Sequence, residues 1–121
     1  MKMKKSFLLI VGVLLLSFTS CEYKFVDPIE VTITEPVSFS QQIEPVFQSK
    51  CVTCHSSRSP ILTTGNAYNN LIDGNFINLE VPESSLIYEQ LSGGHPGGNN
   101  AFSAEELALL LKWIQDGAEN N

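Results

Sequence analysis

The stretch Cys51-Val52-Thr53-Cys54-His55 decides how the rest of this chain is interpreted. Two cysteines separated by two residues and followed directly by histidine can form thioether bonds to one haem, and the adjacent imidazole then lies beneath the iron. The same spacing also suits a redox-active thiol pair, half of a zinc site or a structural disulfide. A zinc site needs further ligands, and only His95 lies beyond the motif, whereas a thioredoxin-like pair needs a βαβ pattern that the sequence lacks. The motif therefore favours one covalent haem c attached to Cys51 and Cys54, with His55 beneath the iron.

The first twenty residues have the pattern of an export signal. Three lysines precede a largely apolar run from Phe7 to Phe18, which is well short of the ~20 apolar residues that a membrane-spanning helix needs. The next residues, Phe18-Thr19-Ser20-Cys21, resemble the lipobox of bacterial lipoproteins, in which the cysteine is acylated and becomes the new N-terminus. We therefore predict a signal peptide at residues 1–20 and a lipid anchor on Cys21 that binds the protein to a bilayer. The alternative is cleavage to a soluble secreted protein with one free cysteine.

The cysteine count and the charge agree with this interpretation. The chain has three cysteines, an odd number that one lipidated residue and two thioethers would use completely. Three of the seven basic residues precede Cys21 and all thirteen acidic residues follow it, which leaves four basic residues and a formal charge of −9 with neutral histidines. This charge disfavours nucleic acid and anionic lipid as binding partners and favours brief encounters with proteins that present a basic face. Acidic charge that only keeps an envelope protein soluble is the other interpretation.

The processed chain is expected to consist of a linker and one folded domain. Residues 21–37 contain Pro28 and Pro36 and lack a helical period, so we expect an extended linker there. The alternation of apolar and polar residues in 29–34 also suits a short strand, but no second strand is in view to pair with it. Residues 38–121 are expected to form an all-α domain of three to five short helices.

The first helix of this domain runs into the cysteine motif. Its N-cap is expected to be Ser38 together with Gln41, or Ser40 alone. Pro45 lacks a backbone N–H, so the regular helix must either begin close to Glu44 or kink there. The apolar residues that share one face of this helix are Phe39, Ile43, Val46 and Phe47.

Three further helices are expected. A short one ends at Asp73-Gly74, and another runs from Ser84 to Leu91. The last helix begins with a capping box of Ser103 and Glu106 and has Gly117 as its C-terminal cap. The first of these runs through Ala67, Leu71 and Ile72, and in the second Leu86, Ile87 and Leu91 share one face. The buried stripe of the last helix is expected to consist of Leu107, Leu110, Leu111 and Ile114, with Trp113 flanking it.

With these features the chain resembles a class I cytochrome c domain, in the variant that occurs as a small module of bacterial lipoproteins and larger envelope proteins. The resemblance covers roughly residues 38–118. It implies a small cytochrome c-like fold whose first and last helices cross over the haem edge. It also implies that Cys51 and Cys54 are the thioether attachments and that His55 is the proximal iron ligand. The matching segments are Phe39 to Phe47 leading into the motif, the turn at Pro82-Glu83-Ser84-Ser85-Leu86, and Leu111 to Ala118.

The chain departs from this family at the sixth iron ligand. Most members use a methionine, often followed by proline, from a loop before the last helix. The only methionines here are Met1 and Met3, which are lost with the signal peptide. His95, followed by Pro96, stands where that methionine would be, in a glycine-rich loop that can approach a flat cofactor closely. We therefore predict bis-histidine iron with His55 and His95 as ligands, and a solvent-exposed loop histidine is the alternative.

The haem is also expected to organise the domain around itself. A domain of this size buries little apolar surface, and a covalent haem supplies a large apolar centre. Arg58 is a candidate partner for a haem propionate, and a solvated loop arginine is the alternative. The residues expected to pack on the haem are Phe47, Leu86, Leu110 and Trp113.

The expected function is single-electron transfer between redox proteins of the cell envelope. Nothing in the sequence resembles a catalytic constellation, so we expect an electron carrier and no enzyme. The lipid anchor places the protein on a membrane, facing the periplasm or the cell exterior. One alternative is a haem-based ligand-binding or sensor protein in which His95 is displaceable or not bound. Another is a lipoprotein without haem that carries a thiol pair.

Overall fold

All regular secondary structure in the described part of the chain is helical, as predicted. The computed structural model describes residues 31–95 and 101–121 and contains no strand there. The predicted signal peptide, the lipidation site Cys21 and most of the linker lie outside the described residues. No described helix is long and apolar enough to span a bilayer. In chain order the elements are the π-helical turn η1 (Phe39–Ile43), α2 (Glu44–Lys50), α3 (Val52–His55), α4 (Ala67–Asp73), the 3-10 turn η2 (Pro82–Ser84), α5 (Leu86–Ser92) and α6 (Ala104–Gln115).

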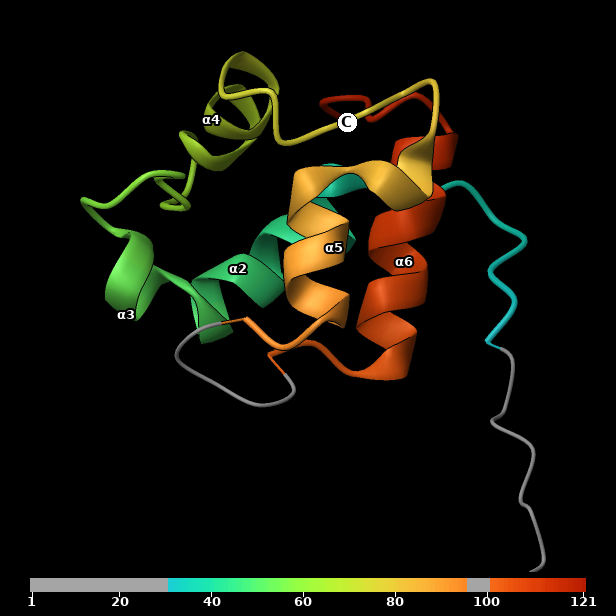
Figure 1. Cartoon of the computed structure of the whole chain (residues 1–121), viewed down its shortest axis with the longest axis horizontal. Helices are drawn as coiled ribbons and strands as arrows, with labels where there is room; N and C mark the ends of the chain where they lie inside the picture. Colours follow the sequence, from blue (N-terminus) through green and yellow to red (C-terminus); the bar gives the residue numbers. More distant parts are fainter. Residues whose placement is uncertain (1–30, 96–100) are drawn as a thin grey trace, which may run out of the picture.

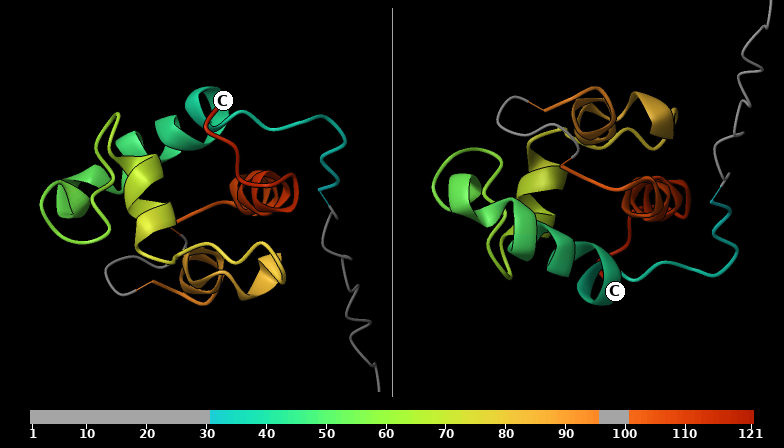
Figure 2. Two further views of the ribbon diagram at one scale, coloured as in Figure 1. Left: turned by 90° about the horizontal axis from the view of Figure 1, so that it is seen from above. Right: turned by 90° about the horizontal axis from the view of Figure 1, so that it is seen from below.

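Helix α6 is the centre of the arrangement. It packs against η1, η2 and α5, and Figure 1 shows α5 and α6 side by side. Viewed nearly end-on in Figure 2, α6 lies between the η1–α2 segment on one side and the η2–α5 segment on the other. The short helix α3 continues from α2 and projects away from α6. The first and last helical segments of the described domain are therefore in contact, while the cysteine motif lies toward its edge.

The first helix begins with a π-helical turn and becomes regular at the proline. Ser38 is the N-cap, as predicted, because its Oγ accepts a hydrogen bond from the Gln41 N–H at 3.3 Å. In a capping box the side chain of the third helical residue, here Gln41, would accept from the Ser38 N–H. That part of the prediction was wrong, because the Gln42 Oε1 accepts this bond at 2.9 Å. The wider winding of a π-turn places the fourth residue where the third lies in an α-helix. Regular α-helix then starts at Glu44 with Pro45 in its first turn, where the missing N–H costs nothing.

Aromatic side chains fill much of the core, and they do not line the cavity beside the cysteine motif. Phe39 packs on Trp113 and Tyr68 with ring centroids 5.0 and 5.5 Å apart, and Phe47 packs on Phe102 at 5.8 Å. The Trp113 Nε1–H donates to the Glu119 carbonyl at 2.8 Å. Of the four residues expected to pack on a haem, only Leu86 lines the cavity. The other three, Phe47, Leu110 and Trp113, are at most 1% exposed among protein side chains, so that expectation was wrong for them.

Both predicted caps of the last helix are present. The Ser103 Oγ accepts from the Glu106 N–H at 3.2 Å, and the Glu106 carboxylate accepts from the Ser103 N–H at 2.6 Å. Gly117 has φ of +105°, which suits glycine, and its N–H donates to the Ile114 carbonyl at 3.0 Å. Trp113, predicted to flank the buried stripe, is itself in the core. The Glu106 carboxylate also pairs with Lys50, so the start of α6 lies next to the cysteine motif.

The end of the predicted linker is part of the packed domain. Val37 lies just before the predicted boundary at residue 38 but is only 2% exposed, and Ile33 packs against the same core. Asn121 fastens this segment, since its Oδ1 accepts from the Phe39 N–H at 2.7 Å and its main-chain oxygen accepts from the Ser40 N–H at 2.9 Å. These bonds satisfy N–H groups that the first helical turn leaves free.

Candidate cofactor-binding site

The cysteine motif forms a single helical turn. Cys51 ends α2 and precedes α3, and its carbonyl accepts from the Cys54 N–H at 3.1 Å and the His55 N–H at 2.9 Å. Residues three and four apart on a helix lie on the same face. The two thiols and the imidazole therefore project from one side of this turn, which is the arrangement that a single cofactor would require.

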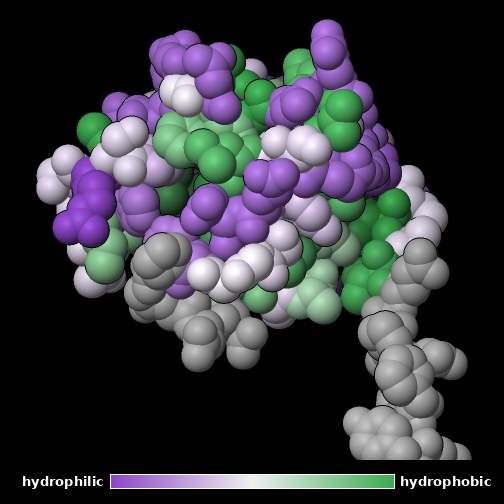
Figure 3. All heavy atoms as spheres, viewed as in Figure 1, coloured by the Kyte–Doolittle hydropathy of each residue, from purple (hydrophilic) through white to green (hydrophobic). Residues whose placement is uncertain are grey.

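A cavity of about 520 Å³ opens on this side of the turn. Its volume lies within the range of pockets that hold small-molecule cofactors, roughly 300 to 1,000 Å³. Figure 3 shows apolar side chains interrupting the polar surface between α4 and α5, where part of the cavity wall reaches the surface. The lining residues are Lys50, Cys51, Cys54, His55, Arg58, Ser59, Pro60, Leu62, Phe76, Leu86, Ile87, Gln90, Leu91, His95 and Ala101.

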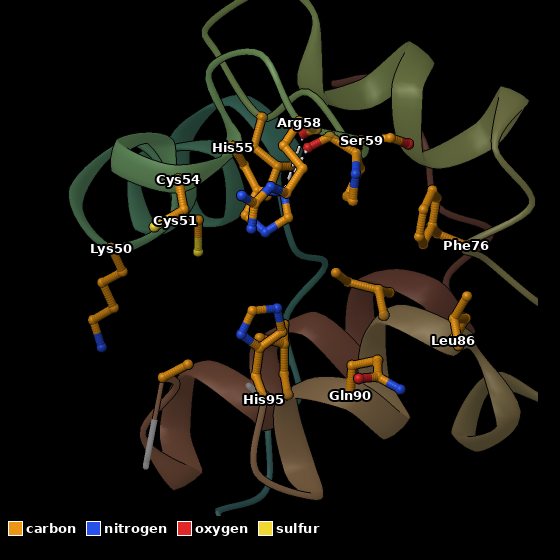
Figure 4. A pocket seen from close by; sticks show the side chains of 15 residues that line it. Lys50, Cys51, Cys54, His55, Arg58, Ser59, Phe76, Leu86, Gln90 and His95 are labelled. Carbon is orange, nitrogen blue, oxygen red and sulfur yellow. Dashed lines mark hydrogen bonds between the residues drawn. The ribbon is translucent and has the colours of Figure 1, made fainter. Parts of the chain in front are cut away.

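The two histidines predicted as a pair face each other across this cavity. Their ring centroids lie 5.8 Å apart with an interplanar angle of 58°, and Figure 4 shows the rings pointing toward one another from opposite walls. Two imidazoles that each bind one metal ion at about 2 Å place their ring centroids roughly 6 Å apart. The separation of His55 and His95, forty residues apart in the sequence, therefore fits one metal ion between them.

A backbone carbonyl orients the His55 ring. The His55 Nδ1 lies 2.9 Å from the Pro60 carbonyl oxygen and 3.3 Å from the Arg58 carbonyl oxygen. A carbonyl can only accept, so these contacts place the proton on Nδ1 and leave the Nε2 lone pair free for a metal ion. No sequence pattern indicates Pro60 as this partner, because the contact depends on how the loop folds back.

The two motif cysteines are free thiols in different surroundings. Cys51 is half-buried, whereas Cys54 is exposed. Burial raises the pKa of the Cys51 thiol, and Glu106 and Cys54 raise it further while Lys50 acts in the opposite direction. A redox-active thiol pair depends on a lowered thiol pKa, whereas the surroundings of Cys51 shift its pKa in the opposite direction.

The two ends of the cavity differ in polarity. Figure 4 shows Lys50 and the cysteines at one end and Phe76 with Leu86 at the other. Leu86 is 43% exposed, which is unusual for a leucine on a cavity wall and provides apolar surface for a ligand to cover. Arg58 lines the cavity as well, so its guanidinium is available to a carboxylate of a bound cofactor. Apolar walls with a few basic groups suit a flat, mainly apolar macrocycle that carries carboxylates.

An ion pair joins the end of α2 to the start of α6 beside Cys51. The Lys50 ammonium lies 2.5 Å from the Glu106 carboxylate, which also caps α6 through Ser103. Partial burial acts to raise the pKa of Glu106, but the hydrogen bonds from Lys50 and Ser103 outweigh it, so the pKa lies below its ordinary value of 4.5. The carboxylate is therefore charged in the folded protein at a lower pH than in the unfolded chain.

This lowered pKa predicts an acid-sensitive contribution to stability. A depressed carboxyl pKa stabilises the fold above the unfolded-state value, and the contribution is lost as the pH falls through the folded-state value. Glu106→Gln should therefore show a smaller drop in melting temperature between pH 7 and pH 3 than the wild type, because glutamine keeps the capping box without titrating. Glu105→Gln, which lacks these two partners, is the control. Equal acid sensitivity in Glu106→Gln and the wild type would contradict the assignment.

Comparison of the chain with protein-family models, with curated proteins and with solved structures found no match. The interpretation of the cavity therefore depends on the residues that line it and on their geometry.

Proposed function

We propose that this protein is a membrane-tethered monohaem c-type cytochrome that carries single electrons between redox proteins of the cell envelope. The observation that supports it most strongly is the opposed pair of His55 and His95, 5.8 Å apart beside the two motif thiols. In this proposal Cys51 and Cys54 attach one haem c, and the domain has a cytochrome c-like fold. Contact between η1 and α6, the first and last helical segments of the domain, agrees with such a fold.

The residues of the cavity then have separate tasks. His55 would hold the iron through Nε2 while the Pro60 carbonyl holds its ring, and His95 would hold the iron from the facing wall of the cavity. When bound, haem supplies a ferric/ferrous couple that takes up and releases one electron. With His55 and His95 both holding the iron, no protein-free ligand position would remain for a substrate, which favours a carrier over an enzyme. Two imidazoles and a net acidic chain also favour a lower reduction potential than a histidine/methionine pair would give.

The charge pattern supports a redox partner with a basic face. No lysine or arginine occurs between Arg58 and Lys112, a segment that contributes much of the cavity wall. Complementary charge accelerates encounters without requiring tight binding, which suits a carrier that must leave its partner quickly. The acidic residues in the described parts of this segment are Asp73, Glu80, Glu83, Glu89, Glu105 and Glu106.

The location follows from the N-terminal pattern. In this proposal residues 1–20 direct export, and acylated Cys21 anchors the chain to a membrane. The protein would then face the periplasm or the cell exterior, where its partners are redox proteins of the envelope. The residues from Cys21 up to the segment that packs on the core at Ile33 would link the lipid to the haem domain.

A redox titration with carbon monoxide as a second reagent tests the function. We expect a reversible transition that follows a one-electron Nernst curve, about 59 mV per tenfold change in the oxidised-to-reduced ratio. We also expect the reduced protein to bind no carbon monoxide, because His95 already occupies the iron. Ready binding of carbon monoxide by the wild type would contradict the carrier function and favour the ligand-binding alternative.

A further inference from the structure

We infer that Asn70 is a positioning residue for the iron ligand His55 and acts through the Pro60–Ile61 peptide group. This inference rests on the proposed function, since it concerns how the protein adjusts the iron ligand. Asn70 lies on α4 and is not among the site residues predicted from the sequence. The contacts that support it connect His55 with the loop between α3 and α4, and that loop with α4 and α2.

The loop after His55 returns to the motif and is anchored at its far end. The Leu62 N–H donates to the His55 carbonyl at 2.8 Å, which closes residues 56–61 into a loop. Residues 56–59 are exposed, whereas Pro60 is buried. The position of the Pro60 carbonyl oxygen, which accepts from the His55 Nδ1–H at 2.9 Å, is therefore set by contacts of residues 60–62.

Asn70 holds the other side of the same peptide group. Its Oδ1 accepts from the Ile61 N–H at 3.3 Å, and its Nδ2 donates to the Asn66 carbonyl at 3.0 Å within the α4 segment. The Pro60 carbonyl and the Ile61 N–H belong to one planar peptide unit and point in opposite directions. Asn70 therefore fixes the plane of the group whose oxygen binds His55.

The arrangement is a chain of two hydrogen bonds through one peptide. The His55 Nδ1–H donates to the Pro60 oxygen, and the Ile61 N–H donates to Asn70. Hydrogen bonds in such a chain polarise one another, so the bond to Asn70 makes the Pro60 oxygen a better acceptor. A better acceptor on Nδ1 increases the basicity of the ligating Nε2, which favours ferric iron.

Gln48 of α2 anchors the loop two peptide groups further along, at Leu62–Thr63. Its Nε2 donates to the Leu62 carbonyl at 2.7 Å, across the loop from α2. Helices α4 and α2 thus hold the Pro60–Ile61 and Leu62–Thr63 peptide groups, which flank the Ile61–Leu62 peptide group. Loss of Gln48 should displace the Pro60 carbonyl in the same sense as loss of Asn70, but less directly.

The test uses the full chain matured with haem and compares Asn70→Leu with Asn69→Leu. Asn69 is the exposed neighbour on α4 and makes no hydrogen bond through its side chain to the described residues, so it is a matched control. Two readouts are followed: the reduction potential, and the exchange rate of the His55 ring N–H with solvent by nuclear magnetic resonance. A structural role alone would lower the melting temperature without moving either readout.

In Asn70→Leu we expect ring N–H exchange about fivefold faster, the factor that corresponds to about 1 kcal/mol for one hydrogen bond. If the preference for ferric iron falls by the same factor, the reduction potential rises by about 40 mV for a one-electron couple. Asn70→Asp keeps the acceptor and should retain slow exchange. Asn69→Leu should leave both readouts unchanged.

An Asn70→Leu protein whose potential and ring exchange equal those of Asn69→Leu would overturn the inference. If Asn70→Leu does not fold, the same two readouts are taken on Gln48→Leu. This variant is expected to show a smaller rise in potential. No rise in its potential would overturn the inference. Failure of the proposed function is distinguishable, because a wild-type protein without covalent haem has no such potential. That outcome would overturn both.

Discussion

The double variant Cys51→Ala/Cys54→Ala is expected to lose covalent haem completely. The two thiols project from one face of a single helical turn onto the cavity, and they are the cysteines on which the proposed attachment depends. Without thioethers, any haem in the cavity is held by iron–imidazole bonds alone and is released by denaturation. The measurements are a haem stain on a denaturing gel and the intact mass, which should fall by the mass of one haem after allowance for the substitutions.

Cys21→Ala is the matched control for this experiment. It also removes a cysteine, but from outside the proposed haem domain, so the exported protein should keep the stain and lose its lipid. Each single variant, Cys51→Ala or Cys54→Ala, retains one thiol and should keep part of the stain. A stain that persists in the double variant would show that the haem attachment is assigned to the wrong residues.

Replacing the second histidine, His95→Ala, is expected to leave the haem attached but to change its iron from low-spin to high-spin. In the proposed site this change leaves the thioethers and His55 untouched but removes the second ligand, whose ring faces His55 across the cavity. An open axial position should also allow the reduced variant to bind carbon monoxide, which the wild type should not do. Absorption and paramagnetic resonance spectra report the spin state, and a carbon monoxide titration reports the open position.

Gln90→Ala is the control for the His95 variant, because Gln90 is another polar side chain that lines the cavity. It should keep the low-spin spectrum. An unchanged low-spin spectrum in His95→Ala would exclude His95 as the ligand. Lys50 would then be the next candidate, since it lines the cavity, whereas Lys112 pairs with Asp116 and does not line it.

Features fixed by neighbours in the sequence were predictable. The capping box of Ser103 and Glu106, the glycine at position 117 and the start of regular helix near Pro45 all depend on residues within four positions of each other. The all-α class followed from the same local patterns. The use of Gln42 in place of Gln41 was missed because helical reasoning assumes α-helical winding, and the first turn is a π-turn.

Features that depend on tertiary packing were only partly predictable. Trp113 was expected to pack on a haem, but the partner rings of Phe39 and Tyr68 come from other segments of the chain, and they enclose it. The sequence shows how apolar each segment is, but it does not show which segments pack against one another. The exposure of Leu86, the one expected haem contact that lines the cavity, likewise depends on the position of α5.

In the candidate site, too, residues of a local motif were predictable and contacts made by tertiary folding were not. Cys51, Cys54 and His55 were predicted together because they form one short motif. His95 was predicted because it is the one histidine outside the motif, and the two methionines lie in the predicted signal peptide. The hydrogen-bond chain from His55 through the Pro60–Ile61 peptide to Asn70 had no signal in the sequence. It connects a helix to a loop through a backbone group, and any residue can supply a backbone group.

The absorption spectrum of the wild-type protein, matured in a host able to attach haem, is the most direct measurement of whether one haem is bound between His55 and His95. We predict the bands of a six-coordinate, low-spin haem in both the oxidised and the reduced protein, retained after denaturation as covalently bound colour. A colourless exported protein, whose motif thiols react freely with a thiol reagent or are joined to each other, would contradict the account.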